Sequence, residues 1–342
     1  MKLVERIEPF IILGEIMAEA ASAEPSSARA VDLRKKMDSM VQYNRWFTPE
    51  NVKIAVEAIS GVLTSEKITR WLEPYDLSGE HKPLTVGVIM AGNIPLVGFH
   101  DLITVLLSGN MIKARISSRD PELMESIIKI LIEEEPRFKP IIEITGENPV
   151  GTEAVIATGS DNTSRYFEYH FGKSPHLFRK NRSSLAVLDS DTTRDELTLL
   201  GNDIFSFFGL GCRNVSRLLI PANFDKSLLT EAWESHGNLA DHHGWQNNYI
   251  YEKALSTAAG KRFTDGGFFI LRESPVVTSP LAVIHYNSYQ HPDSVRQIID
   301  HDRDKIQTIV GKGLTPFGRA QFPELWDYAD NIDTMRFLLN IK

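Results

Sequence analysis

The segment FFGLGCRNVSR, residues 207–217, contains the only cysteine among 342 residues. Gly209 and Gly211 precede Cys212 closely, and glycines allow backbone shapes that other residues resist and let a ligand approach. The adjacent Arg213 would favour the thiolate, which is the nucleophilic form of cysteine. A cysteine kept only for packing usually lies on an apolar element. The segment therefore indicates a nucleophile, although an incidental loop cysteine fits these residues equally well.

A second chemical candidate is Asn93, in the segment GVIMAGNIPLVGF at residues 87–99. An apolar strand leads into Gly92 and Asn93, and we expect a helix to begin near Pro95. An amide at a strand-to-helix turn is well placed to donate a hydrogen bond to a developing oxyanion. Asparagine also favours the N-cap of a helix for local reasons, and without other support that simpler explanation is preferred.

The elements around Asn93 alternate between apolar runs and helical patterns. Residues 1–80 have mostly helical spacing, and a helix is expected to end near Gly109. Another helix begins after Asp120, the expected N-cap, with Pro121 at its first position. Strands are expected at residues 84–92, 110–117, 141–145 and 154–159. This alternation predicts a parallel sheet with helices packed on it, the architecture of a nucleotide-binding domain.

The pattern begins again with the apolar run at residues 185–189. Thr193 and Glu196 form a capping-box signal for a helix that we expect to reach Phe208. Cys212 then lies on a loop between that helix and a strand at 216–221. Further strands are expected at residues 267–273 and 281–287.

We therefore expect an α/β protein of two domains. Residues 1–184 would form a Rossmann-like nucleotide-binding domain with N-terminal helices, and residues 185–315 a catalytic α/β domain carrying the nucleophile loop. Residues 316–342 would pack back on the core.

Composition excludes several other classes of protein. Hydrophobic residues make up 42% and charged residues 24%, which is ordinary for a globular chain. The net charge of −8 argues against a general nucleic-acid binder. One cysteine forms no internal disulfide, and no run is long enough to span a bilayer or fits a signal peptide. We therefore expect a cytoplasmic protein. Neither HExxH nor cysteine-rich spacing occurs, so we also expect no metal site.

Four motifs, in order along residues 80–220, resemble those of the aldehyde dehydrogenase superfamily. GVIMAGNIPL resembles its Asn-x-Pro pattern after an apolar strand, and SGNMIKAR its strand that ends in a cofactor-binding lysine. ATGSDNTSRYFEYHF resembles its Thr-Gly-Ser turn at the cofactor pyrophosphate, and FFGLGCRNVSRL its nucleophile segment. The C-terminal LTPFGRAQFPELWDYADNIDTMRFLL resembles a narrower group, the fatty-acyl-CoA reductases related to the bacterial luminescence reductase.

The resemblance implies that Cys212 is the catalytic nucleophile and that Asn93 donates to the oxyanion. It also implies an active site in the crevice between the two α/β domains, where such sites generally form. A histidine could serve as an acid or base beside Cys212, and the sequence does not choose among His170, His176 and His236.

For the cofactor, the resemblance places Gly159 and Ser160 at the nicotinamide dinucleotide phosphates. Arg115 stands where the superfamily has its lysine, with Lys113 as a second candidate. An arginine at that place could hold a 2′-phosphate, which favours NADP(H) over NAD(H). The alternative for Arg115 is a solvated charge at the end of a strand.

One departure from the superfamily concerns a carboxylate. Aldehyde-oxidising members use a glutamate just before the second-domain strand to activate the water that hydrolyses the acyl-enzyme. Residues 169–188 contain no Asp or Glu here, so a Cys212 thioester would persist to exchange with a thiol or accept hydride. The same segment holds four cations, which either attract coenzyme A phosphates or form a solvated basic face: Lys173, Arg179, Lys180 and Arg182.

These inferences predict an NAD(P)H-dependent acyl-CoA reductase whose substrate, by resemblance alone, is a long-chain fatty acyl-CoA. One alternative is a thiol-dependent acyltransferase that loads Cys212 without reduction. Another is a non-catalytic subunit on this fold, and an aldehyde-oxidising dehydrogenase is a weaker third. Whether the chain forms homo-oligomers or exchanges acyl groups with a partner protein stays open.

Overall fold

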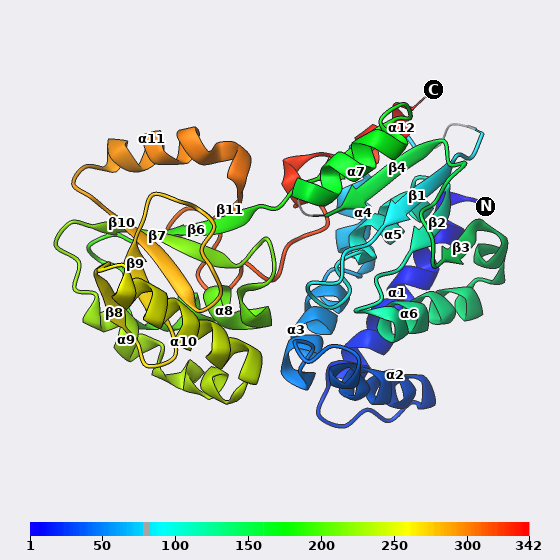
Figure 1. Ribbon diagram of the computed structural model, residues 1–342. Coiled ribbons are helices and arrows are strands. Elements are labelled where there is room, and N and C mark those ends of the chain that lie inside the picture. The colour runs from blue at the N-terminus through cyan, green and yellow to red at the C-terminus, as the bar shows by residue number, and fades with distance from the viewer. Residues whose placement is uncertain (78–81, 160, 342) are drawn as a thin grey trace. The chain divides into compact units, whose positions relative to one another are not determined.

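A computed structural model describes residues 1–77, 82–159 and 161–341 (Figure 1). The chain divides into two compact units. Unit 1 comprises residues 1–180 and 322–342, and unit 2 comprises residues 181–321.

Unit 1 contains helices from both ends of the chain and a parallel sheet. Its helices are α1 (Leu3–Ala21), α2 (Ala28–Ser39), α3 (Pro49–Ser60), α4 (Ser65–Leu72), α5 (Phe99–Leu107), α6 (Pro121–Glu134), α7 (Asp161–Phe171) and α12 (Thr334–Leu339). Its strands are β1 (Thr85–Ile89), β2 (Met111–Arg115), β3 (Ile142–Thr145), β4 (Ala154–Thr158) and β5 (His176–Arg179).

The sheet of unit 1 has the strand order β3-β2-β1-β4-β5, and every pair is parallel. Val88 of β1 lies opposite Ala114 of β2 on one side and Ile156 of β4 on the other. The chain places β2 and β3 on one side of β1 and then β4 and β5 on the other side. Ligands of open α/β sheets bind beyond the carboxyl ends of the strands at such a reversal.

Alternating side chains of this sheet bury two faces, as expected for a parallel sheet covered on both sides. Val86 and Val88 join the main core formed with α1, α5 and α6. Ile89 points to the other face, where Phe167 and Phe171 of α7 pack. Figure 1 shows α7 on one side of the sheet and α5 and α6 on the other.

The C-terminal segment 322–342 belongs to unit 1 and contributes to its main core. Leu325, Met335 and Leu338 are buried there. The Tyr328 hydroxyl accepts a hydrogen bond from Trp71 Nε1 of α4 at 2.7 Å. These contacts join the last residues of the chain to its N-terminal helices.

Unit 2 contains a six-stranded sheet with the order β11-β6-β7-β10-β9-β8, in which β8 alone is antiparallel to its neighbour. Its strands are β6 (Ser183–Val187), β7 (Val215–Pro221), β8 (Phe263–Asp265), β9 (Ile270–Glu273), β10 (Val283–Tyr289) and β11 (Ile306–Val310). Its helices are α8 (Arg194–Phe205), α9 (Ser227–Ala232), α10 (His243–Ala258) and α11 (Pro292–Asp302). In Figure 1, α11 covers one face and α8, α9 and α10 the other.

The α/β fold with parallel sheets expected from the sequence is confirmed, and the capping box of Thr193 and Glu196 at the start of α8 is present. Two predicted helix boundaries, the start of α5 and the end of α8, are wrong. The helix expected near Pro95 begins at Phe99, and α8 ends at Phe205 rather than Phe208. In both places, left-handed backbone interrupts the helix: at Leu96 in the first and at Phe207 and Phe208 in the second.

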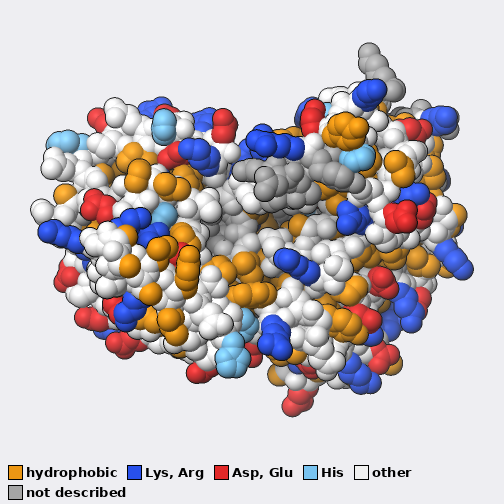
Figure 2. Space-filling model, in the orientation of Figure 1, with side chains coloured by type: hydrophobic (Ala, Val, Ile, Leu, Met, Phe, Trp, Pro, Cys, Tyr) orange, Lys and Arg blue, Asp and Glu red, His pale blue; other side chains and the backbone are white. Residues whose placement is uncertain are grey.

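Surface charges of both signs are interspersed on the face shown in Figure 2. Among the described helices, none combines the length and the apolar character needed to cross a bilayer. Within the same residues, no group of three or more His, Cys, Asp or Glu side chains is arranged to hold a metal ion.

Candidate active site

The loop that carries Cys212 begins with a strained turn. After α8, the short 3₁₀ helix η3 (Ser206–Gly209) places Phe207 at φ 52° and Phe208 at φ 54°, followed by Gly209 at φ 68°. A left-handed conformation costs a non-glycine residue about 1–2 kcal/mol, so two consecutive phenylalanines need strong support from their surroundings. Such strain concentrates at functional sites.

The Asn214 side chain supplies much of this support. Its Nδ2 lies within hydrogen-bond distance of the carbonyl oxygens of Asp203 and Ile204, both at 3.2 Å, and of Ser206 at 2.8 Å. Its Oδ1 accepts from the Gly211 N–H at 2.8 Å. Asn214 is 2% exposed, so these bonds form away from water. The amide therefore closes the carboxyl end of α8 and fixes the backbone just before Cys212.

Cys212 itself is half-buried, on the connection between η3 and β7. Its carbonyl oxygen accepts a hydrogen bond from Ser184 Oγ of β6 at 3.0 Å. The Ser184 N–H donates to the carbonyl of Asn214 at 3.1 Å. The loop is thus tied to α8 on one side and to β6 on the other, which agrees with the loop position predicted for the thiol.

Asn93 lies on the loop that joins β1 to α5. It is half-buried and falls in a bend, while the turn that precedes α5 spans residues 95–98. Gly98 occupies the N-cap position of α5. Helix capping therefore does not explain Asn93. Three residues later, Leu96 adopts φ 57°, and its N–H donates to Asp120 Oδ2 at 2.6 Å.

Three of the predicted residues lie at the carboxyl edge of the unit 1 sheet. Asn93 follows β1, Arg115 ends β2, and Gly159 follows β4. The Gly159 N–H donates to the Arg179 carbonyl at 3.3 Å. Ser160 lies outside the described residues, and Cys212 belongs to unit 2.

The two candidate cations of β2 have different partners. Arg115 Nη1 donates to Asn148 Oδ1 at 2.7 Å, which holds the guanidinium at the carboxyl edge. Lys113 Nζ pairs with the carboxylate of Glu143 at 2.9 Å, and these residues lie opposite each other in β2 and β3. Sequence reasoning missed Asn148, because nothing in the local pattern ties it to β2.

Arg179 does not belong to a solvated basic face. It is 6% exposed, and its Nη1 donates to Asp101 Oδ2 of α5 at 2.6 Å. Its Nη2 donates to Thr334 Oγ1 of α12 at 2.9 Å. The guanidinium is thus engaged inside unit 1 and is not available to coenzyme A phosphates. Lys173 and Lys180 are exposed.

The histidines have mostly structural surroundings. His236 packs against Phe205 at a ring distance of 5.0 Å, and burial lowers the pKa of its imidazole. His176 stacks on Phe178 at 4.1 Å. His242 accepts the Trp245 N–H through Nδ1 and lies 4.3 Å from the Phe208 ring. The ring of His242 therefore contacts the strained turn.

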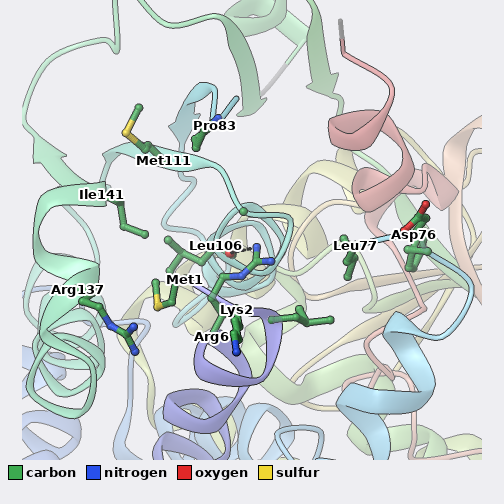
Figure 3. Close-up of a pocket in the computed structure, with 13 residues that line it drawn as sticks. Met1, Lys2, Arg6, Asp76, Leu77, Pro83, Leu106, Met111, Arg137 and Ile141 are labelled. Atoms are coloured by element: carbon green, nitrogen blue, oxygen red, sulfur yellow. Dashed lines mark hydrogen bonds between the residues drawn. The ribbon is translucent and has the colours of Figure 1, made fainter. Parts of the chain in front are cut away.

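A cavity of about 1180 Å³ lies at the opposite edge of the unit 1 sheet, where β1 and β2 begin (Figure 3). Arg6 lines it and is 7% exposed. Its Nη1 donates to the carbonyls of Leu106 and Leu107, at 3.4 and 2.8 Å. A cation at the last carbonyls of a helix stabilises that helix end. Arg6 therefore supports α5, far along the strands from the residues at the carboxyl edge.

Several aldehyde dehydrogenases of known structure are similar to this chain. The NAD-dependent aldehyde dehydrogenase of Sinorhizobium meliloti has a TM-score of 0.66 at 11% identity, covering 91% of this chain and 70% of that one. Aldehyde dehydrogenase C of Pseudomonas syringae, in complex with NAD+ and octanal, has a TM-score of 0.63 at 11% identity, covering 91% and 72%. The indole-3-acetaldehyde dehydrogenase AldA of P. syringae has a TM-score of 0.66 at 13% identity, with coverages of 91% and 72%.

No protein-family model and no curated protein sequence matches the chain. At identities this low, structural similarity establishes the fold alone. The chain therefore has an aldehyde dehydrogenase-like fold, with a Rossmann-like unit and a second α/β unit.

Proposed function

We propose that this chain is an acyl-CoA reductase, which converts a fatty acyl-CoA thioester to the aldehyde with NADPH as reductant. The observation that carries the proposal is the Cys212 loop. The chain has a single thiol, and that thiol follows a strained turn held by Asn214 in an aldehyde dehydrogenase-like fold. Incidental cysteines do not need such a turn.

In this mechanism, the Cys212 thiolate attacks the thioester carbonyl and a carbon–sulfur bond forms. The Asn93 side-chain amide and the Cys212 N–H donate hydrogen bonds to the resulting oxyanion. When the oxyanion collapses, the bond to coenzyme A breaks and its thiolate leaves, taking up the proton that the Cys212 thiol lost. The acyl group is then held on Cys212 as a new thioester.

The carboxyl edge of unit 1 fits a nicotinamide dinucleotide, because the β1/β4 reversal provides the place where such cofactors bind in open α/β sheets. Gly159 lets a phosphate approach the backbone at the end of β4. Arg115, oriented by Asn148, would face a 2′-phosphate. When bound in its reduced form, the cofactor supplies hydride to the acyl carbon. Cys212 leaves as thiolate and the aldehyde is released.

The absence of a carboxylate supports reduction over hydrolysis. Residues 169–188 contain no Asp or Glu that could activate water against the Cys212 thioester. The acyl-enzyme would therefore last long enough for hydride transfer. The long-chain substrate rests on the resemblance of the C-terminal segment to the luminescence-related reductases.

The decisive assay combines purified protein with acyl-CoAs of increasing chain length and either NADPH or NADH. We expect cofactor oxidation and aldehyde formation in equal amounts, both lost in Cys212→Ala. Without reductant, intact-protein mass should increase by one acyl group in the wild type only. An acylated wild type that never consumes NADPH would indicate an acyltransferase. A protein that binds neither acyl group nor cofactor would indicate a non-catalytic subunit.

Cofactor choice is tested by binding, independently of turnover. Arg115→Ala should raise the NADPH dissociation constant about tenfold, as loss of a charge-assisted phosphate contact does, and change NADH binding little. Lys113→Ala is the matched control, because its partner is Glu143. Equal weakening of NADH and NADPH by Arg115→Ala would contradict the 2′-phosphate assignment.

A further inference from the structure

The turn after β2 supports the loop that carries Asn93. A Cβ on Gly92 would clash with the Ser117 side chain, so the two segments approach closely there. Nearby, the Leu96 N–H donates to Asp120 Oδ2 at 2.6 Å, across 24 residues of sequence. Asp120 is 3% exposed, so this bond forms away from solvent.

Asp120 stands at the N-cap position of α6, but its side chain makes no capping hydrogen bond. The predicted N-cap position, with Pro121 at the first helical position, is confirmed, but the side chain does not supply the capping bond. Within the described residues, its Oδ1 has no hydrogen-bond partner. Burial raises the pKa of Asp120 to about 7, against the lowering effect of the Leu96 N–H. A carboxyl group buried at this expense, with one partner, has a role other than capping the start of α6.

The partner itself is unusual. Leu96 has φ 57° although it is a bulky residue with a buried side chain. Its carbonyl accepts the Phe99 N–H at 2.9 Å, which starts α5. Leu96 lies three residues after Asn93, so the backbone at Leu96 determines how the Asn93 loop enters the helix.

We propose that Asp120 is a positioning residue: by accepting the Leu96 N–H, its carboxylate fixes the loop that presents the Asn93 amide. The inference rests on the proposed function, in which Asn93 donates to the oxyanion. It assigns Asp120 no contact with substrate or cofactor. Its effect on catalysis passes through Asn93.

The kinetic test is a double-mutant cycle. Asp120→Ala should lower kcat and kcat/KM together by about tenfold to a hundredfold, as expected when a transition-state donor is misplaced. Asp120→Asn keeps an acceptor for the Leu96 N–H and should recover most of the activity. In an Asn93→Ala background, Asp120→Ala should lower activity little further, because the group it positions is gone.

Two kinetic outcomes would overturn the inference. One is an Asp120→Ala effect of the same size with and without Asn93. The other is an Asp120→Asn variant as inactive as Asp120→Ala. Tyr328→Phe is the control for general destabilisation of unit 1, because it removes hydroxyl bonds to Trp71 and Tyr75 and leaves the Asn93 loop unaltered.

Hydrogen exchange separates this inference from the proposed function. The amides of residues 91–98 should exchange faster in Asp120→Ala than in the wild type, Asp120→Asn or Tyr328→Phe. If the wild type reduced no acyl-CoA, the proposed function would fail, while exchange would still decide whether Asp120 fixes the loop. Unchanged exchange at Leu96 in Asp120→Ala would refute the positioning role.

Discussion

Two loops of this chain hold bulky residues in left-handed backbone, and different side chains support them. The Cys212 loop depends on Asn214, a neutral amide whose oxygen and nitrogen are both hydrogen-bonded. The Asn93 loop depends on Asp120, which makes one side-chain bond and leaves one buried oxygen without a partner in the described residues. The first support is independent of pH, whereas the second carries a titrating group.

The difference matters because the two loops have different tasks in the proposed reaction. The nucleophile loop must keep its shape while the sulfur changes between thiolate and thioester, and a saturated neutral amide does not respond to those changes. The oxyanion loop needs only a fixed donor. A costly carboxylate is tolerated there because it supplies a short, charge-assisted acceptor for one N–H.

The largest effect is expected from Asn214→Ala. It would leave three carbonyls and one N–H without their amide partner, which should lower the free energy of unfolding by about 3–5 kcal/mol. Acyl-enzyme formation should fall by about a hundredfold or more, because the Cys212 backbone loses its support. Chemical denaturation and intact-protein mass after acyl-CoA addition measure the two effects.

Asn202→Ala is the matched control, since Asn202 is an exposed asparagine on the same helix α8. It should change stability by less than about 0.5 kcal/mol. If Asn214→Ala had as little effect as Asn202→Ala on both stability and acyl-enzyme formation, Asn214 would not be the residue that supports the Cys212 loop.

The second prediction concerns pH. Burial raises the pKa of Asp120 from an ordinary 3.8 to about 7, so between about pH 4 and 7 this carboxyl group binds more protons in the folded state than in the unfolded state. Stability from this group is therefore complete below pH 4 and lost as pH rises through 7, by up to about 4 kcal/mol. Asp120→Asn should be more stable than the wild type at pH 8 and equal to it at pH 4.

Asp203 of α8 provides the comparison, because burial raises its pKa to about 7 as well. Both of its oxygens accept backbone N–H groups, from Gly318 at 2.7 Å and Ala320 at 2.9 Å. Asp203→Asn would lose one of these bonds, so its gain at pH 8 should be smaller than that of Asp120→Asn. Urea unfolding between pH 4 and 8 measures the free energy of unfolding of the wild type and both variants. If this free energy had the same pH dependence in Asp120→Asn and in the wild type, the prediction for Asp120 would be contradicted.

The sequence predicted the elements near the candidate site better than the contacts within it. Apolar runs identify β1, β2 and β4, whose carboxyl ends lead to Asn93, Arg115 and Gly159, and they identify β7, which follows the Cys212 loop. No local signal marks Leu96, Phe207 or Phe208 as left-handed, since apolar residues at those positions favour continued helix. Their conformation depends on Asp120 and Asn214, which become visible only when the chain is folded.

Long-range pairs explain the other failures. The run around Arg179 is rich in cations and indicates a basic surface, yet its guanidinium pairs with Asp101, which is 78 residues away. Asp120 occupies the N-cap position that Pro121 indicates, yet its side chain accepts the Leu96 N–H instead of capping α6. In both cases a polar side chain is engaged by a distant partner, and local propensity cannot choose between the near and the far one.

A smaller effect should follow from Gly92→Ala. The added Cβ would clash with Ser117 and lie 3.0 Å from the Arg119 Cβ, so the Asn93 loop would shift away from the turn after β2. Overpacking of this kind costs about 1–3 kcal/mol. Ser117→Gly removes the closest atoms, and the double variant should recover part of both stability and kcat. A double variant no better than Gly92→Ala would show that the contact does not limit the loop.

The smallest effect is expected from Gly209→Ala in the other loop. Gly209 needs φ 68°, but the nearest atom to an added Cβ is the Ile204 carbonyl oxygen at an ordinary 3.6 Å. Only the backbone cost applies, about 1 kcal/mol, and Gly209→Asn should cost less because asparagine tolerates this conformation. With Asn214 still in place, kcat should change less than in Gly92→Ala. If Gly209→Ala lost more kcat than Gly92→Ala while the two variants had equal thermal stability, Asn214 would not be enough to hold the Cys212 loop when the turn before Cys212 is altered.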